Sequence, residues 1–353
     1  MMNASDPTRV SRVVISPPNW LGDAVMALPA MAALRRHWAS ADLTIAAVPA
    51  VAALFREDTD VHPDHVIDLP VGTNAIVAAL EGGGFDVGVL FPNSFRSAWE
   101  FWRAGIPARL GFATSGRRML LTLRSPRVRR AGVTHQADYY RDLVAGLGVS
   151  EPTPPLPRIA PLHPSAERAH ALLAQLGVTD DELLVGMAPG AAYGQAKQWP
   201  PDRMAEVAAR LARTRLSRIV IVGASHDREA ARAIESWLRA HTPDVVDRVI
   251  NLAGRTSLGA LVGVAARFSA FVSNDSGAMH LVAALGTPVV AIFGPTDERA
   301  TRPLGSHRVI RVPVFCRPCL LRDCPIDHRC MKRVSADSVL SAVSAVLDSR
   351  VSR

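Results

Sequence analysis

Residues 270–294 read AFVSNDSGAMHLVAALGTPVVAIFG, and this stretch decides the fold class. An apolar run ends at Asn274, a helical pattern covers 277–285, and a second apolar run covers 288–294. The Gly-Thr-Pro sequence at 286–288 ends the helical pattern, because glycine and proline interrupt regular structure. Two buried strands joined by a helix form a parallel pair, since parallel strands need a crossover connection. The stretch therefore predicts a parallel sheet covered by helices on both faces.

The same alternation of apolar runs and helical patterns recurs along most of the chain. Strands are predicted at 12–17, 43–48, 65–70, 85–91, 183–189, 218–223, 248–251, 270–274 and 288–294. Helices are predicted at 22–38, 135–147, 201–214, 227–240, 257–267 and 277–285.

A proline-rich segment divides this pattern into two halves. Six prolines lie between residues 152 and 164, a composition typical of a stiff spacer between domains. A chain of 353 residues also suits two domains of ordinary size. The sequence therefore predicts an α/β protein with two doubly wound, Rossmann-like domains facing a central cleft. The first domain covers 1–150, the linker 151–164, and the second domain 165–353, with a cysteine-rich segment and a helix at its end.

Arginine is concentrated in one region of the chain. The formal net charge is +8, and only two of the 40 basic residues are lysines. Residues 96–130 contain nine arginines and one acidic residue, Glu100, so this region holds a surplus equal to the whole net charge. Such a surplus favours a nucleic acid, an anionic membrane surface or an acidic substrate, although charge runs also occur as solvated surface. The aromatic residues of the region fit a helix face and a strand, so we expect no nucleic acid.

Neither a signal peptide nor a membrane span is predicted. Residues 1–19 lack the basic start and apolar run of a secretory signal. Residues 276–296 carry no Asp, Glu, Lys or Arg, but the break at 286–288 divides them into a helix and a strand. We therefore expect a cytoplasmic protein.

All four cysteines lie close together in the sequence, as Cys316, Cys319, Cys324 and Cys330. The C-x2-C spacing occurs in zinc sites, but the spacings that follow it do not match the common zinc frameworks. A disulfide is disfavoured in the cytoplasm. We therefore expect a reduced, packed cluster and no bound metal.

A loop of the second half has the composition of a phosphate-binding site. Residues 190–200, GAAYGQAKQWP, follow a predicted strand, and their small side chains let backbone N–H groups approach an anion. Lys197 adds a positive charge, although the loop lacks the G-K-[ST] sequence of a Walker loop. Neither half carries G-x-G-x-x-G after its first strand, which argues against a nicotinamide dehydrogenase. Asp227 follows another predicted strand, where an acidic residue can accept hydrogen bonds from ribose.

A second anion site is predicted at residues 274–280, NDSGAMH, where a strand runs directly into a helix. The first N–H groups of that helix, at Ser276 and Gly277, would point at a diphosphate. The alternative explanations are an N-cap role for Asp275 or Ser276 and a merely buried position for His280.

The loop PNWLGD at 18–23 carries a candidate catalytic carboxylate. Asp23 follows the first predicted strand at the start of a helix, where an acidic residue also complements the helix dipole. At the carboxyl edge of a parallel sheet it could deprotonate an acceptor hydroxyl.

The chain resembles the ADP-heptose:lipopolysaccharide heptosyltransferases. The segments that carry the resemblance are PNWLGDAVMALPAM, NSFRSAWEFWRAGIPARLGF, APGAAYGQAKQWP and NDSGAMHLVAALGTPVVAIFGPT, and the similarity extends in order from residue 12 to residue 347. The stretch CRPCLLRDCPIDHRCM is similar to the end of the heptosyltransferase II branch. The resemblance implies a GT-B fold whose first domain binds the acceptor and whose second domain binds the donor. It also implies an inverting single displacement without a covalent intermediate.

The resemblance further implies roles for individual residues. Asp23 matches the general base, and Lys197 matches a lysine that contacts the donor phosphates. Donor contacts are expected from Ala192, Tyr193, Lys197, Asp227, Thr256, Asp275, Ser276, Gly277 and His280. Acceptor contacts are expected from Asn19, Ser94, Arg96, Arg117 and Arg118. Relatives that add the first heptose have hydroxyl residues where this chain has Ala192 and Tyr193, so phosphate contacts there must come from backbone N–H groups or Tyr193.

The reaction implied is the transfer of heptose from ADP-L-glycero-D-manno-heptose to the first heptose of the lipopolysaccharide inner core. No metal ion or other cofactor is implied. The partners implied are ADP-heptose, a phosphorylated lipid A–Kdo–heptose acceptor and, transiently, the inner face of the inner membrane. A heptosyltransferase with a different acceptor position, or a nucleotide-sugar epimerase of the same architecture, is the alternative. An epimerase would release nucleotide from the donor without needing an acceptor.

Overall fold

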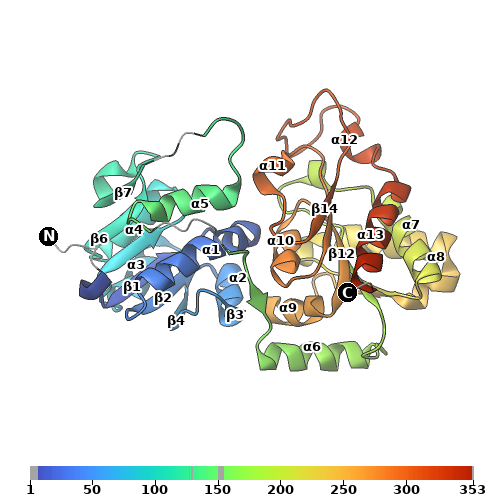
Figure 1. Ribbon diagram of the computed structural model, residues 1–353, viewed down its shortest axis with the longest axis horizontal. Helices are drawn as coiled ribbons and strands as arrows, with labels where there is room; N and C mark the ends of the chain where they lie inside the picture. The colour runs from blue at the N-terminus through green and yellow to red at the C-terminus, as the bar shows by residue number, and fades with distance from the viewer. Residues whose placement is uncertain (1–6, 127, 129, 150–154, 352–353) are drawn as a thin grey trace. The chain divides into compact units, whose positions relative to one another are not determined.

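A parallel sheet forms the centre of each half of the chain (Figure 1). The computed structural model describes residues 7–126, 128, 130–149 and 155–351. The chain divides into two units between Ile159 and Ala160, inside the expected linker 151–164. Of that linker, 151–154 lie outside the described residues, and its last two residues, 163 and 164, already belong to a helix.

The first unit has a six-stranded sheet flanked by helices. Its strands pair in parallel in the order β4 (His65–Asp68), β2 (Asp42–Ala47), β1 (Arg12–Ser16), β5 (Val87–Leu90), β6 (Ala108–Phe112) and β7 (Leu123–Ser125). Its α-helices are α1 (Leu21–His37), α2 (Pro49–Ala52), α3 (Thr73–Glu81), α4 (Phe95–Arg103) and α5 (Gln136–Ala145). The short elements are η1 (Pro7–Arg9), η2 (Ala53–Arg56), η3 (Arg117–Leu120) and β3 (Asp58–Thr59), which pairs with β8 (Ile159–Ala160).

The second unit repeats this arrangement. Its strands pair in parallel in the order β11 (Val249–Asn251), β10 (Arg218–Ile221), β9 (Leu184–Ala188), β12 (Phe268–Asn274), β13 (Val289–Ile292) and β14 (His307–Ile310). Its α-helices are α6 (His163–Gln175), α7 (Pro201–Thr214), α8 (Arg228–His241), α9 (Leu258–Ala266), α10 (Gly277–Ala284), α11 (Glu298–Thr301), α12 (Arg329–Lys332) and α13 (Ala336–Val351). The short helices are η4 (Gln195–Lys197), η5 (Ser225–Asp227) and η6 (Pro243–Arg248). No helix of the described residues is long and apolar enough to span a bilayer.

Both faces of the second sheet are buried under helices. On β9, Val185 and Met187 pack into a core with α7, α8 and α13, while Leu184 and Ala188 pack into a core with α6, α9 and α10. Figure 1 shows α7 and α8 on one side of the sheet and α6 and α9 on the other. Alternate residues of one strand therefore enter different cores, as expected for a strand without a polar face. The prediction of two doubly wound α/β units is confirmed.

The elements that were not predicted from the sequence include β7, β14 and α6. The two strands are short, lie at sheet edges and carry Arg124 and Arg308, so neither forms a continuous apolar run. Helix α6 has Pro164 in its first turn, where the missing N–H costs no helical hydrogen bond. A proline interpreted as part of a linker therefore lies inside a helix.

The close packing of β9 makes Gly186 a sensitive position. A Cβ atom there would lie 2.3 Å from the Phe268 ring and 2.6 Å from the Phe271 ring, both fully buried. We expect Gly186→Ala to lower the free energy of unfolding by about 1–3 kcal/mol, because buried aromatic rings must shift to admit the methyl group. Urea unfolding measures this. Gly82→Ala is the control, since nothing lies within 4 Å of its added methyl group, and equal effects of the two changes would contradict the packing.

Candidate active site

The predicted site loops lie where each sheet reverses its strand order. In the first sheet β1 and β5 are neighbours, and in the second β9 and β12 are neighbours, while the chain continues outward from each pair in opposite directions. Ligands of doubly wound folds bind beyond the carboxyl ends of strands at such switch points. Asp23 and Asn93 follow β1 and β5, and Lys197 and Asp275 follow β9 and β12. Each sheet thus places two polar side chains at its switch point.

Lys197 and Asp275 form a buried ion pair. Lys197 Nζ lies 2.7 Å from Asp275 Oδ2, and the two side chains are 13% and 6% exposed. The Thr296 hydroxyl donates to the same Oδ2 over 2.7 Å. The ammonium also lies 4.8 Å from the centre of the Tyr193 ring, within cation–π range. The desolvation of both charges is offset by this geometry, and the ammonium is held in a fixed position at the second switch point.

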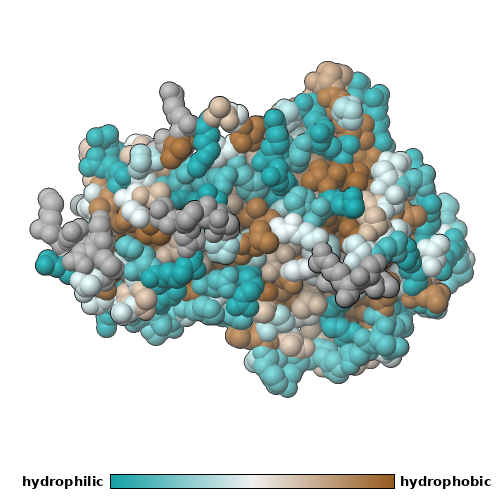
Figure 2. Space-filling model, in the orientation of Figure 1, coloured by the Kyte–Doolittle hydropathy of each residue, from teal (hydrophilic) through white to brown (hydrophobic). Residues whose placement is uncertain are grey.

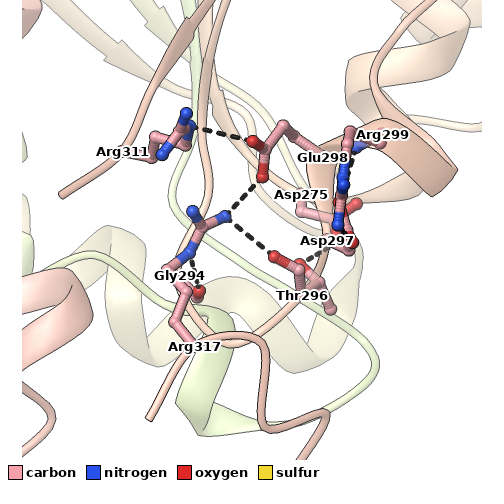
Figure 3. A network of polar contacts seen from close by, with 8 residues as sticks. All are labelled: Asp275, Gly294, Thr296, Asp297, Glu298, Arg299, Arg311 and Arg317. Atoms are coloured by element: carbon pink, nitrogen blue, oxygen red, sulfur yellow. Dashed lines mark hydrogen bonds and ion pairs between the residues drawn. The ribbon is translucent and has the colours of Figure 1, made fainter. Parts of the chain in front are cut away.

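Arginine contacts fix the loop that presents Thr296 (Figure 3). Arg317 donates to two carbonyls of residues 294–298, over 2.7 and 2.9 Å, and pairs with Glu298 over 2.7 Å. Glu298 also pairs with Arg311 over 2.8 Å. Burial alone would raise the pKa of Glu298, but the two arginines lower it below its usual value, so the carboxylate stays ionised. The contact between Thr296 and Asp275 is therefore supported by Arg317, which binds the Thr296 carbonyl and pairs with Glu298.

Helix α10 begins without a side-chain cap. Ser276 precedes Gly277, the first helical residue, but its hydroxyl makes no capping bond and lies 3.0 Å from the hydroxyl of Ser273. The carboxylate of Asp275 is engaged in the ion pair. The side-chain N-cap explanation for these two residues is therefore wrong, and the helix start has the form of an anion site. His280 is buried, with 5% exposure.

The cysteine-rich segment packs against the loop that carries Lys197. The Ala196 N–H donates to the Arg322 carbonyl over 2.9 Å. The Ala196 carbonyl lies 2.7 Å from His328 Nε2. Both backbone groups of the residue before Lys197 are therefore held by segment 316–330, which gives that segment a positioning role.

Ala192 and Tyr193, two of the predicted donor residues, are exposed. The Tyr193 hydroxyl donates to the Leu320 carbonyl over 2.9 Å. Next to it, a Cβ atom on Gly194 would lie 2.4 Å from the Arg322 carbonyl oxygen, so only glycine fits. Because the tyrosine proton is used within the protein, backbone N–H groups are the better candidates for phosphate contacts in this loop.

Asp227 packs against the backbone of the Lys197 loop. A Cβ atom on Gly190 would lie 1.8 Å from Asp227 Oδ1. Asp227 Oδ2 accepts the Ala224 N–H over 2.8 Å. Thr256 is partly exposed in the loop after β11. The structure therefore brings Asp227 beside the glycine-rich loop, and Thr256 lies on the next strand-end loop of the same sheet.

A pocket of about 390 Å³ adjoins the network of Figure 3. It is lined by Arg311, Pro313, Val314, Phe315 and Arg317. Both arginines are paired with Glu298, so much of their charge is neutralised. None of the predicted donor residues lines this pocket.

Asp23 is oriented by a buried tyrosine. It lies in the first turn of α1, where Trp20 is the N-cap residue. The Tyr140 hydroxyl donates to Asp23 Oδ1 over 3.0 Å. Burial, and then the charge of Asp23, raise the pKa of Tyr140 above its ordinary value, so the phenol remains a donor. A carboxylate held in this way suits a general base.

A second polar chain lies at the end of β5. Asn93 Nδ2 donates to the Tyr139 hydroxyl over 2.6 Å, and Arg117 Nη2 donates to Asn93 Oδ1 over 3.1 Å. The rings of Tyr139 and Tyr140 contact each other with centroids 5.6 Å apart. Two adjacent tyrosines of α5 therefore connect Asn93 with Asp23 across the first switch point.

Arg117 is a structural residue. It is fully buried, and its guanidinium donates to the carbonyls of Phe112, over 2.9 Å, and Pro92. Burial lowers the pKa of Arg117 to about 10, against the opposing influence of Tyr139, so it stays charged at neutral pH. The prediction that Arg117 contacts the acceptor is wrong, because its donors are used within the protein. It holds the loop after β5 instead.

The other acceptor candidates lie at the surface. Asn19, Ser94, Arg96 and Arg118 are exposed, and Ser94 caps α4. Arg96 Nε lies 3.6 Å from the carboxylate of Glu100. The structure does not join these residues into one cluster of hydrogen bonds.

The arginine-rich region is less uniform than its sequence suggests. Arg109 is buried, and Arg130 is paired with Asp142. Arg127 and Arg129 lie outside the described residues. The exposed cationic surface is therefore smaller than the surplus in the sequence.

The four cysteines are unpaired in the structure. Cys330 is buried, Cys316 and Cys319 are partly exposed, and Cys324 is exposed. Burial, followed by the neighbouring thiols, raises the pKa of Cys330. Among the described residues, no group of three or more His, Cys, Asp or Glu side chains has the geometry of a metal site.

The sequence patterns did not point to Tyr139, Tyr140, Thr296 or His328 as site residues. One signal was available. The chain has only three tyrosines, and all of them, including Tyr193, lie at the two switch points. The contacts of Thr296 and His328 depend on tertiary structure and carry no comparable signal.

Known proteins place this chain in a family. The model of glycosyltransferase family 9 (heptosyltransferase) matches residues 74–329. The lipooligosaccharide heptosyltransferase 2 of Haemophilus ducreyi is 31% identical over 320 residues, which cover 85% of this chain and 88% of the relative. The lipopolysaccharide heptosyltransferase 2 of Escherichia coli is 30% identical over 323 residues, with the same coverage of 85% and 88%.

A solved structure agrees with these relatives. The E. coli ADP-heptose lps heptosyltransferase II has a TM-score of 0.82 and 25% identity, covering 96% of this chain and 99% of that one. Two Rossmann-like units with this similarity define a glycosyltransferase of GT-B architecture. The chain belongs to glycosyltransferase family 9, the heptosyltransferases.

The neighbouring residues Arg117 and Arg118 give a test of the site description. Arg117→Ala should lower the free energy of unfolding by about 2–4 kcal/mol, because it leaves buried carbonyls without donors. Arg118→Ala should change it by less than about 0.5 kcal/mol, because Arg118 is exposed. Urea unfolding of both variants measures the difference. A comparable loss in the two variants would contradict the structural assignment of Arg117.

Proposed function

We propose that this heptosyltransferase moves heptose from ADP-L-glycero-D-manno-heptose to the first heptose of the lipopolysaccharide inner core, with inversion at the anomeric carbon. The observation that carries the proposal is the buried Lys197–Asp275–Thr296 cluster beside the uncapped start of α10. An ammonium group fixed by its ion pair, next to the uncapped start of a helix, suits a diphosphate. The relatives, which are heptosyltransferases 2 and an ADP-heptose enzyme, support the choice of donor.

The second unit provides the donor site in this proposal. Lys197 and the N–H groups at Ser276 and Gly277 stabilise the negative charge that develops on the departing ADP. Such stabilisation is usually the largest catalytic effect. Asp227 accepts hydrogen bonds from ribose, Thr256 lies near adenine, and further contacts come from Ala192, Tyr193 and His280. Because the lysine and the helix start supply the positive charge, the proposed reaction uses no metal ion.

The first unit provides the base and the acceptor site. Asp23, oriented by Tyr140, removes the proton from the acceptor hydroxyl as that oxygen attacks the anomeric carbon. Arg96 and Arg118 meet the phosphates of the acceptor, and Asn19 and Ser94 contact its sugars. An acceptor of this kind is anchored in a bilayer, so we infer that the enzyme works in the cytoplasm at the inner face of the inner membrane.

The direct test supplies the protein with ADP-heptose and heptose-Kdo2-lipid A. We expect the acceptor to gain the mass of one heptose. A matched reaction with Kdo2-lipid A, which lacks the first heptose, should give no product. Addition to that shorter acceptor would indicate a different heptosyltransferase, and release of ADP without any acceptor would favour the epimerase alternative.

Asp23→Asn tests the base. The amide cannot take a proton, so we expect kcat to fall by about 10²–10⁴ while ADP affinity stays unchanged. Tyr140→Phe keeps the carboxylate but removes its hydrogen bond, and we expect a smaller loss, of about tenfold. Steady-state kinetics and calorimetric titration with ADP measure both variants. A near wild-type kcat in Asp23→Asn would mean that Asp23 only complements the helix dipole.

A further inference from the structure

Helix α4 exposes a row of aromatic side chains. Phe95, Trp99 and Trp102 are 49%, 36% and 47% exposed. Their spacing of four and three residues places them on one side of the helix. The rings stack, with centroids 6.3 Å apart for Phe95 and Trp99 and 4.9 Å apart for Trp99 and Trp102. Hydrophobic areas occur on the molecular surface (Figure 2). A contiguous group of large exposed aromatic residues, such as that of α4, marks an interaction site.

The aromatic row is not needed to hold the helix in place. The buried side of α4 carries Ala98, Glu100 and Phe101. Phe101 covers Gly88 of β5 so closely that a Cβ atom on this glycine would lie 2.5 Å from the ring. The inner side of the helix therefore supplies its packing, and the outer aromatic residues require another explanation.

The exposed charges of α4 and of the adjacent η3 are all positive. Arg96 and Arg103 are exposed on α4, and the adjacent η3 adds Arg118 together with Met119, which is 91% exposed. The only acidic residue of α4, Glu100, is buried. We call the exposed residues the α4 face; they are Phe95, Arg96, Trp99, Trp102, Arg103, Arg118 and Met119.

We propose that the α4 face docks on an anionic lipid bilayer at the level of the headgroups. Tryptophan and phenylalanine partition into the membrane interface, where their rings meet apolar material and water together. Arginines beside them attract anionic headgroups and let their stems lie along apolar surface. Aromatic residues on one side of a helix with basic residues around them are the composition of an interfacial helix.

The position of the α4 face gives docking a purpose, which rests on the proposed function. Helix α4 begins at Phe95, directly after the loop of Asn93 and Ser94 at the first switch point. Docking of α4 would therefore bring the candidate acceptor site of this unit to the surface in which a lipid-linked acceptor is anchored. A second copy of the chain is a poorer occupant, because a symmetric contact would oppose arginines to arginines.

The test is co-sedimentation of the full chain with vesicles of phosphatidylcholine alone and of phosphatidylcholine mixed with phosphatidylglycerol. We expect binding to the mixed vesicles that weakens with salt and shifts tryptophan emission to the blue. Replacing both Trp99 and Trp102 by Ser should weaken partitioning by at least about tenfold. Leu216→Ser, an exposed change in the second unit, is the matched control and should have no effect.

Activity separates this proposal from the proposed function. With an acceptor freed of its acyl chains, the double tryptophan variant should match the wild type, whereas with acceptor in vesicles its KM should rise at unchanged kcat. Transfer to the soluble acceptor without vesicle binding by the wild type would overturn docking and leave the proposed function standing. Vesicle binding by the wild type without transfer to either acceptor would support docking and overturn the proposed function. Equal partitioning of the variant and the wild type, or a wild-type dimer that the double substitution dissociates, would also overturn docking.

Discussion

The ion pair between Lys197 and Asp275 is the interaction on which the geometry of the candidate donor site depends. An ammonium and a carboxylate both lose hydration there, and the pair is stable only if its geometry is held and further hydrogen bonds satisfy it. Asn274 supplies part of that constraint, because its side chain accepts the Trp199 N–H and donates to the Pro189 carbonyl, joining the ends of β12 and β9. Thr296 supplies the rest from the end of β13. Asn274 and Thr296 thereby connect the loops that follow β9, β12 and β13 around one ion pair.

The fold and the outline of the donor site could be predicted because their signals are local. Apolar runs, helical spacing and the short segment from Asn274 to Gly277 are contiguous in the sequence, and the Rossmann order then places them at a switch point. The long-range contacts that hold the site loops in place could not be predicted in this way. His328 contacts the carbonyl of Ala196, which is 132 residues away in the sequence, and no hydrophobic periodicity predicts such a contact.

The arginine-rich region shows the limit of reasoning from composition. Arg117 and Arg118 are adjacent in sequence, yet the first is fully buried on backbone carbonyls and the second is exposed. The two arginines contribute equally to the net charge, but only the exposed one can contact an acidic ligand. The aromatic residues of α4 show the converse case. They lie on one side of a helix, as expected, but they are exposed although they are apolar. Sequence spacing identifies the sides of a helix but not which side faces solvent.

In the function proposed for this chain, the second switch point binds the diphosphate of the donor. Calorimetric titration with ADP and with adenosine tests this binding most directly. The wild type should bind ADP much more tightly than adenosine. Lys197→Ala should lower ADP affinity by about 10–100-fold, because it removes a hydrogen-bonding charge, and leave adenosine affinity unchanged. The unchanged adenosine affinity would show that the unit remains folded. ADP affinity equal to that of the wild type would contradict the account, since the diphosphate would then lie away from Lys197.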